Sequence, residues 1–226
     1  MDRQQIPAAT TSATRREPAL LATHNVLRNT YMLLAATLLF SAATAGVSMA
    51  TNMPYLGLLP TLGIYFGLLF LTHKCRNSAM GIVLVFALTG FLGLTLGPML
   101  SIYLTAVPNG GELVMTSLGL TGLIFMGLSG YVLTTRKDFS FLAGFVVVGF
   151  FAILGVIVLS LFMDLSGFQL AISAGIVVLM AGFILFQTSA IIHGGETNYI
   201  MATVGLYVSI YNLFTHLLFL LGMGDD

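Results

Sequence analysis

Long apolar runs separated by short polar gaps fill most of the chain beyond its first 30 residues. Seven runs contain no Asp, Glu, Lys or Arg: Tyr31 to Ala50, Leu56 to Thr72, Ala79 to Leu104, Leu113 to Leu133, Phe141 to Met163, Phe168 to Ile192 and Tyr199 to Leu221. A helix needs about 20 apolar residues to cross the hydrocarbon core of a bilayer. The pattern therefore predicts an all-α membrane protein with seven transmembrane helices, of which the second is short.

Composition supports a membrane protein with one folded domain. Hydrophobic residues make up 58% of the chain and charged residues only 7%, whereas about a quarter of the residues in soluble domains are charged. We predict a seven-span membrane domain over residues 29–226 and a disordered cytosolic tail over residues 1–28, because the tail is rich in Ala, Thr, Ser and Gln. The tail has no apolar core of the kind found in cleaved signal peptides, so we expect none.

The basic residues predict the orientation of the spans, because Lys and Arg are retained on the cytoplasmic side. All eight lie in the tail or in the second and fourth gaps: Arg3, Arg15, Arg16, Arg28, Lys74, Arg76, Arg136 and Lys137. The first, third and fifth gaps and the C-terminus contain no Lys or Arg. We therefore expect the N-terminus inside and the C-terminus outside, in the inner membrane of a bacterial cell. A mitochondrial protein is the weaker alternative, because the tail also contains Asp2 and Glu17.

Glycine in the third run indicates close packing between helices. Gly90, Gly93 and Gly97 fall on one helical face, and small residues in spans let two backbones approach. Pro98 follows directly and removes a backbone donor, so a kink is expected there. Gly93, Gly97 and Pro98 are thus candidates for a packing interface, with a moving hinge as the alternative.

The last two runs carry the most polar surface. Ser209, Asn212 and His216 recur at spacings of three and four, which places them on one face of the last helix, and Gln187 lies near the end of the sixth. One interpretation is a cluster of hydrogen bonds between helices. The other is a hydrated pathway or sensor, although no carboxylate is present there to titrate or to attract a cation.

Catalysis is not expected. Gly127 to Gly130 (GLSG) and His216 resemble the serine motif and the histidine of rhomboid proteases, but the predicted orientation places Ser129 about 24 Å and His216 about 8 Å from the outer boundary. A nucleophile and its base must lie within about 3 Å of each other. The four histidines lie in separate segments without metal-binding spacing. We therefore expect no enzyme activity, metal or cofactor.

Several segments resemble the Bax-inhibitor (TMBIM) family: residues 186–200 (FQTSAIIHGGETNYI), 206–214 (LYVSIYNLF), 131–138 (YVLTTRKD) and Gly90-Phe91 to Gly97-Pro98. The likeness extends from His24 to the end of the chain. It implies a seven-helix fold in which the other helices enclose the last one. It also implies two functional associations, a calcium leak sensitive to pH and an interaction with FtsH, a membrane protease of protein quality control.

The chain departs from the channel-like members of that family at the paired carboxylates. The matching positions hold Gln187 and Ser209, which do not titrate as carboxylates. We therefore expect a non-enzymatic protein that binds and modulates FtsH, engaged through the tail residues Arg3, Arg15, Arg16 and Glu17. The alternative is a calcium or other cation leak channel with an altered sensor. Expected partners are FtsH and the lipid bilayer, with calcium only in the alternative and no nucleic acid.

Overall fold

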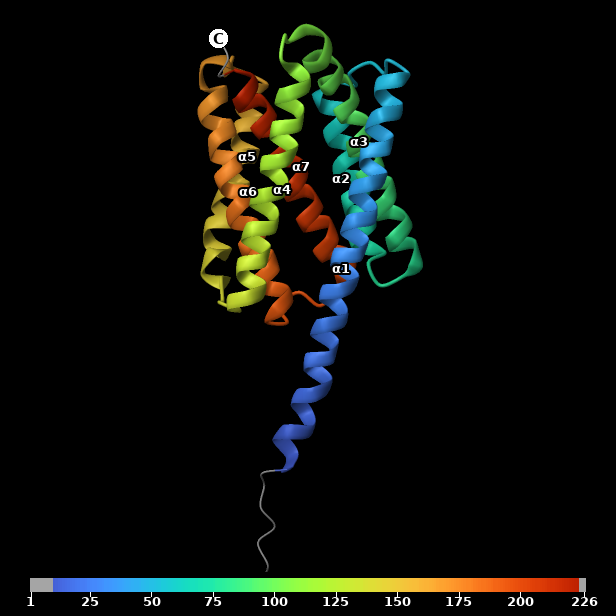
Figure 1. Ribbon diagram of the computed structural model, residues 1–226, viewed down its shortest axis with the longest axis vertical. Coiled ribbons are helices and arrows are strands. Elements are labelled where there is room, and N and C mark those ends of the chain that lie inside the picture. The colour runs from blue at the N-terminus through green and yellow to red at the C-terminus, as the bar shows by residue number, and fades with distance from the viewer. Residues whose placement is uncertain (1–9, 224–226) are drawn as a thin grey trace, which may run out of the picture.

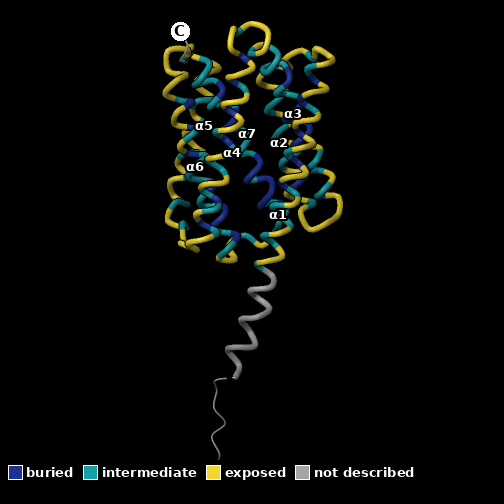
Figure 2. The backbone as a smooth tube through the Cα atoms, viewed as in Figure 1, coloured by how far each residue is buried: buried dark blue, intermediate teal, exposed yellow. Residues whose placement is uncertain are grey.

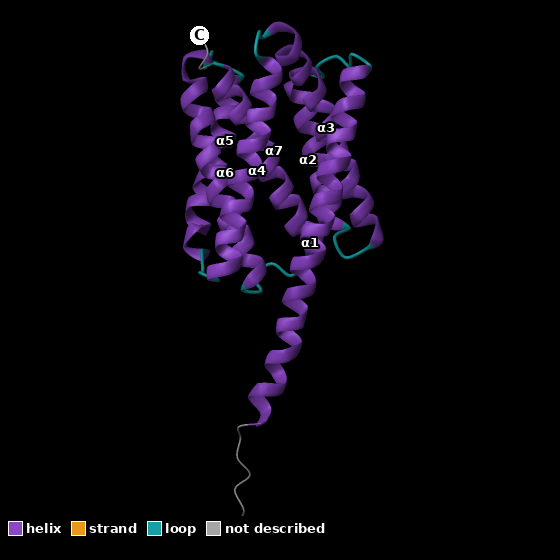
Figure 3. Cartoon of the chain, in the orientation of Figure 1, coloured by secondary structure: helices purple, strands orange, loops and turns teal. Residues whose placement is uncertain are grey.

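A computed structural model describes the backbone of residues 10–223, and side-chain surroundings from Thr23 onward. Within this part the chain is all-helical and contains no strand (Figures 1 and 3). The helices are α1 (Thr10–Ala50), α2 (Leu58–Lys74), α3 (Ala79–Ala106), α4 (Gly110–Thr135), α5 (Ala143–Ser160), α6 (Gln169–Ile192) and α7 (Tyr199–Gly222). Two short 3₁₀ turns, Ser140–Leu142 and Ser166–Phe168, precede α5 and α6. The predicted all-α class is confirmed.

Six stretches of the described chain are long and apolar enough to cross a membrane: 23–50, 79–106, 110–135, 140–160, 166–192 and 199–222. The remaining helix, α2, is apolar but has only 17 residues. At 1.5 Å per residue it is about 25 Å long, slightly less than the hydrocarbon thickness of about 30 Å. Local thinning of the bilayer accommodates such a mismatch at modest cost. Length and composition thus support six spans. That α2 is a seventh span stays a prediction, and the orientation of the spans stays a prediction too.

Helix α1 starts earlier than the first predicted run, which began at Tyr31. Residues 1–9, including Arg3, lie outside the described part of the chain, but α1 begins at Thr10, so residues 10–28 are helical. Arg15, Arg16 and Glu17 lie in this helical segment. Helix propagation from the apolar half of α1 and the helix preference of Ala, Leu, Arg and Glu account for the difference. The division of the chain into a tail and a membrane domain stays a prediction.

Helix α7 holds much of the buried core (Figure 2). It packs against α1, α3, α4 and α6, and it contributes Leu206 and Tyr207 to one cluster of buried residues, Val204 to a second and Leu218 to a third. In contrast, α5 has no buried residue and packs on α6 and its own preceding turn. Full enclosure of α7 by the other helices stays a prediction.

The glycine face of α3 lies against α1, and these two helices make the most extensive contact in the bundle. A Cβ on Gly93 would overlap the Thr44 hydroxyl and the Ser41 carbonyl, and a Cβ on Gly97 would overlap Ser48. The close approach lets Ser48 Oγ donate to the Leu94 carbonyl at 2.8 Å. Helix α3 continues past Pro98 to Ala106. These contacts fit the packing interpretation of Gly93 and Gly97, and the hinge interpretation stays untested.

Replacing Gly93 with Ala should destabilise the bundle, because the new methyl group meets backbone as well as side-chain atoms of α1. Overpacking of this kind costs about 1–3 kcal/mol. Gly119→Ala is the matched control, since a Cβ there meets nothing within 4 Å. Unfolding in detergent, followed by circular dichroism, measures the difference. Equal stability of the two variants would contradict the α1–α3 interface.

The predicted orientation can be tested with reporter fusions after Lys74 and after Asp226. Lys74 ends α2 on the expected cytoplasmic side, and the basic residues flanking that gap should hold it inside. We expect the reporter after Lys74 to be active inside the cell and the reporter after Asp226 to be active outside. Activity on the same side would rule out the arrangement of seven spans.

Candidate functional site

A buried hydrogen-bonded cluster joins three helices near the end of α4. The Tyr31 hydroxyl of α1 bonds to Ser129 Oγ of α4, and Ser129 Oγ lies 3.1 Å from Thr188 Oγ1 of α6. Ser129 and Thr188 are buried, so the three hydroxyl groups satisfy one another without water. The serine of the GLSG motif is therefore part of a structural contact between helices.

Beside this cluster, α6 holds the loop that precedes α5. Ser189 Oγ accepts the Phe139 backbone N–H at 2.9 Å, and His193 Nδ1 donates to the Ser189 carbonyl at 3.0 Å. Asp138, in the same exposed loop, accepts the Ser140 backbone N–H at 2.8 Å. This bond to Ser140 is the main reason why the pKa of Asp138 is lowered, and the nearby His193 and Ser189 lower it further. The loop is thus fixed to the end of α6.

Two tyrosines of α7 bond to α3 at the centre of the bundle. Tyr207 donates to the Thr89 carbonyl at 3.2 Å and accepts from Ser41 Oγ of α1 at 2.5 Å. One turn later, the Tyr211 hydroxyl lies 3.0 Å from Thr95 Oγ1. This face was not predicted from the sequence. The available signal was the spacing of four between Tyr207 and Tyr211, together with Ser41, Thr44 and Ser48 of α1 at spacings of three and four.

The predicted polar face of α7 divides into two kinds of contact. Ser209 Oγ donates to the Gly205 carbonyl at 2.9 Å, and Asn212 Nδ2 donates to the Val208 carbonyl at 2.8 Å, both within α7. His216 instead reaches α6, where its Nδ1 lies 3.1 Å from Ser173 Oγ. His216 and Ser173 line a cavity of about 340 Å³. Among the hydrogen bonds of the described chain, none links Ser209, Asn212 and His216 to one another.

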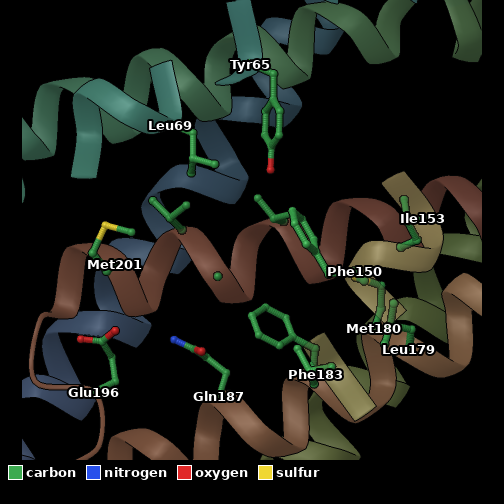
Figure 4. Close-up of a pocket in the computed structure, with 14 residues that line it drawn as sticks. Tyr65, Leu69, Phe150, Ile153, Leu179, Met180, Phe183, Gln187, Glu196 and Met201 are labelled. Carbon is green, nitrogen blue, oxygen red and sulfur yellow. The ribbon is translucent and has the colours of Figure 1, made fainter. Parts of the chain in front are cut away.

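Gln187 lies apart from His216 but close to Ser209. Its side chain packs against Gly205, where a Cβ would come within 3.2 Å of the amide carbon, and the Gly205 carbonyl accepts the Ser209 hydroxyl. Gln187 and Ser209 thus both contact Gly205. Gln187 also faces a second cavity, of about 320 Å³, between α2, α5, α6 and α7 (Figure 4).

The arrangement offers no recognisable catalytic or metal centre in the described residues. Ser129 bonds to Tyr31 and Thr188, whereas His216 bonds to Ser173 on another part of α6. The structure therefore does not bring the rhomboid-like pair together. Within residues 23–223, no group of three or more His, Cys, Asp or Glu residues could hold a metal ion. The polar groups inside the bundle instead connect helices or line cavities.

Comparisons with known proteins agree with this membrane bundle. The family described as "Inhibitor of apoptosis-promoting Bax1" matches residues 23–226. An uncharacterised protein of Pseudomonas aeruginosa is 55% identical over 100% of both chains. The "Modulator of FtsH protease YccA" of Escherichia coli is 51% identical over 95% of this chain and 97% of its own. A protein from a second Escherichia coli strain, with the same identity and coverage, is named "Inner membrane protein YccA".

These relatives are similar to the chain along nearly its whole length, and the family match covers residues 23–226. With six apolar helices of spanning length, the chain is a multi-pass protein of the bacterial inner membrane. The resemblance that the motifs indicated is confirmed: the chain belongs to the Bax inhibitor family.

Proposed function

We propose that this protein binds the membrane protease FtsH and modulates it, without catalytic activity of its own. The observation that carries the proposal is the 51% identity, over 95% of this chain, to a relative named as a modulator of that protease. The site geometry is consistent with it. Ser129, the candidate nucleophile, is occupied by contacts between helices, and α1, α3 and α7 are joined by close packing and buried hydrogen bonds.

The segment before residue 23 is our proposed handle for the protease. An ATP-driven protease must grip a segment that it can unfold, and local unfolding concentrates at chain termini. The connections at Cys75–Ser78, Arg136–Phe139 and His193–Asn198 are short and lie between packed helices. Once gripped, the protein resists extraction, occupies the protease and thereby competes with other substrates.

Deleting Arg3 through Glu17 should lengthen the lifetime of the protein in cells that contain FtsH. The deletion removes the handle and leaves residues 23–223, which form the bundle, unchanged. A pulse-chase experiment in cells with and without the protease measures the effect. A full-length variant with Arg15, Arg16 and Glu17 replaced by Ser serves as the control that separates charge from length. Unchanged FtsH-dependent turnover of the inserted deletion variant would refute the tail mechanism.

A cation leak is the second candidate, favoured by the contacts that positions 187 and 209 both make with Gly205. We expect the unmodified protein to show little pH-dependent calcium leak, because Gln187 and Ser209 do not change charge near neutral pH. Replacing both residues with Asp should create a proton-sensitive pair, since two adjacent carboxylates disfavour double ionisation. Calcium flux into liposomes from pH 5 to pH 8 measures both proteins. Strong pH-gated flux through the unmodified protein would place the sensor elsewhere.

A further inference from the structure

The cavity between α2, α5, α6 and α7 has the volume and lining of a site for a hydrocarbon chain. Its volume is about 320 Å³, and its walls include Phe150, Ile153, Leu179, Met180 and Phe183. Phe150 lines the cavity and is 51% exposed on the outside of α5. The cavity therefore opens sideways, toward the lipid. A helix about 10 Å across is several times too large to enter it, whereas volumes of this order suit small ligands.

One polar side chain inside the cavity lacks a protein partner. Gln187 is only 7% exposed, and its amide makes no hydrogen bond to another residue of the described chain. Figure 4 shows the amide pointing into the cavity, toward the backbone of α7. An unpaired amide in an apolar site costs about 1–3 kcal/mol. A ligand that supplies a hydrogen-bond acceptor at this depth would remove that cost.

The charged end of the cavity lies where α6 turns into α7. Glu196, half-buried, is its only charged lining residue, and Figure 4 shows its carboxylate facing the same space as Gln187. Helix α2 ends at Lys74 on this side of the bundle, because Asn198 Nδ2 donates to the Arg76 carbonyl at 3.0 Å. A headgroup with both an ammonium and a phosphate group matches the negative charge of Glu196 and the positive charge of Lys74. A fatty acid anion would instead place its carboxylate near Glu196 and be repelled.

We propose that this cavity binds phosphatidylethanolamine. One acyl chain of the lipid lies along the apolar wall, and the ester carbonyl of that chain accepts a hydrogen bond from the Gln187 amide. The ammonium group of the lipid headgroup pairs with Glu196. Leu179 lies eight residues before Gln187 on α6, about 12 Å deeper along the helix axis, which gives the chain its direction. The proposal concerns the purified chain and lipid alone, so its outcome is independent of any effect on FtsH.

The absence of tryptophan from the chain provides a direct test. Phe150→Trp places a single fluorophore at the mouth of the cavity, and Phe151→Trp places one on the neighbouring position of α5, which does not line it. Both proteins are inserted into vesicles containing a small fraction of lipid with brominated acyl chains, which quench a fluorophore on contact. The brominated lipid is either phosphatidylethanolamine or phosphatidylglycerol with identical chains.

For Phe150→Trp we expect brominated phosphatidylethanolamine to bind about tenfold more tightly than brominated phosphatidylglycerol, as one charge-assisted bond suggests. Phe151→Trp, which contacts bulk lipid, should be quenched equally by both. Equal quenching of Phe150→Trp by the two lipids would overturn the proposal. A second result would also overturn it: FtsH protects Phe150→Trp from both lipids, and without FtsH the protein shows no headgroup preference. In that case a protein would be the occupant of the cavity.

Second variants in the Phe150→Trp background test the two polar contacts. Gln187→Leu should weaken phosphatidylethanolamine binding about fivefold, the effect of one lost hydrogen bond. Its control is Gln169→Leu, the same change at the start of α6, away from this cavity. Glu196→Gln should reduce the preference between headgroups, and its control is Glu112→Gln at the start of α4. Binding that is unchanged by both Gln187→Leu and Glu196→Gln would also overturn the proposal.

Discussion

Polar groups inside a bilayer must find partners within the protein, and this constraint decides how α7 is placed. Water is absent there, so each unpaired group costs several kcal/mol. Tyr207, which is 1% exposed, meets the constraint by bonding to α1 and α3 together. Many Ser and Thr side chains meet it locally, as Thr121 does by donating to the Ser117 carbonyl. Of these two kinds of hydrogen bond, only the bonds between helices help to fix the arrangement of the bundle.

Close backbone approach and hydrogen bonding support each other on the α1–α3 side. The absence of a side chain at Gly93 and Gly97 brings α1 near enough for Ser48 to reach the α3 backbone. The α5 side differs: α5 contributes no buried residue and contacts mainly α6. Its close approach at Gly149 is to the Leu179 side chain, and no side-chain hydrogen bond of the described residues links α5 to another helix. Phe side chains fill part of the space there and leave one cavity beside α7 and another between α5 and α6. The bundle is consequently tight on one side and loose on the other.

Periodicity and charge predicted the helices well because the spans are long and uninterrupted. The last run was predicted as Tyr199 to Leu221, and the helix runs from Tyr199 to Gly222. Its start is fixed by Asn198, whose side chain accepts the backbone N–H groups of Ile200 and Met201. The early start of α1 was missed, because the composition of a polar segment does not show whether an adjoining helix continues through it.

The contacts between helices were harder to predict than the helices. An apolar span has hydrophobic residues on all faces, so its pattern does not show which face turns inward. In one of the two interpretations Ser209 and Asn212 bond across the bundle, but in the structure each bonds to a carbonyl one turn earlier in α7. The partner of Tyr207 depends on the packing of α1 against α3. The cavity beside Gln187 depends on the spacing of α2 and α5, which no local pattern specifies.

The distribution of these bonds bears on a protein that is pulled from its N-terminus. Force applied there acts first on α1, which packs against α3 and α7 and bonds to α3, α4 and α7 through Ser48, Tyr31 and Ser41. Two of these bonds belong to the buried residues Ser41 and Ser48, and a bond broken there is not readily replaced by a bond to water. All three bonds would have to break nearly together, because α1 moves as one helix. A protease pulling on this segment therefore meets a well-secured helix first, whereas the loosely packed α5 lies far along the chain.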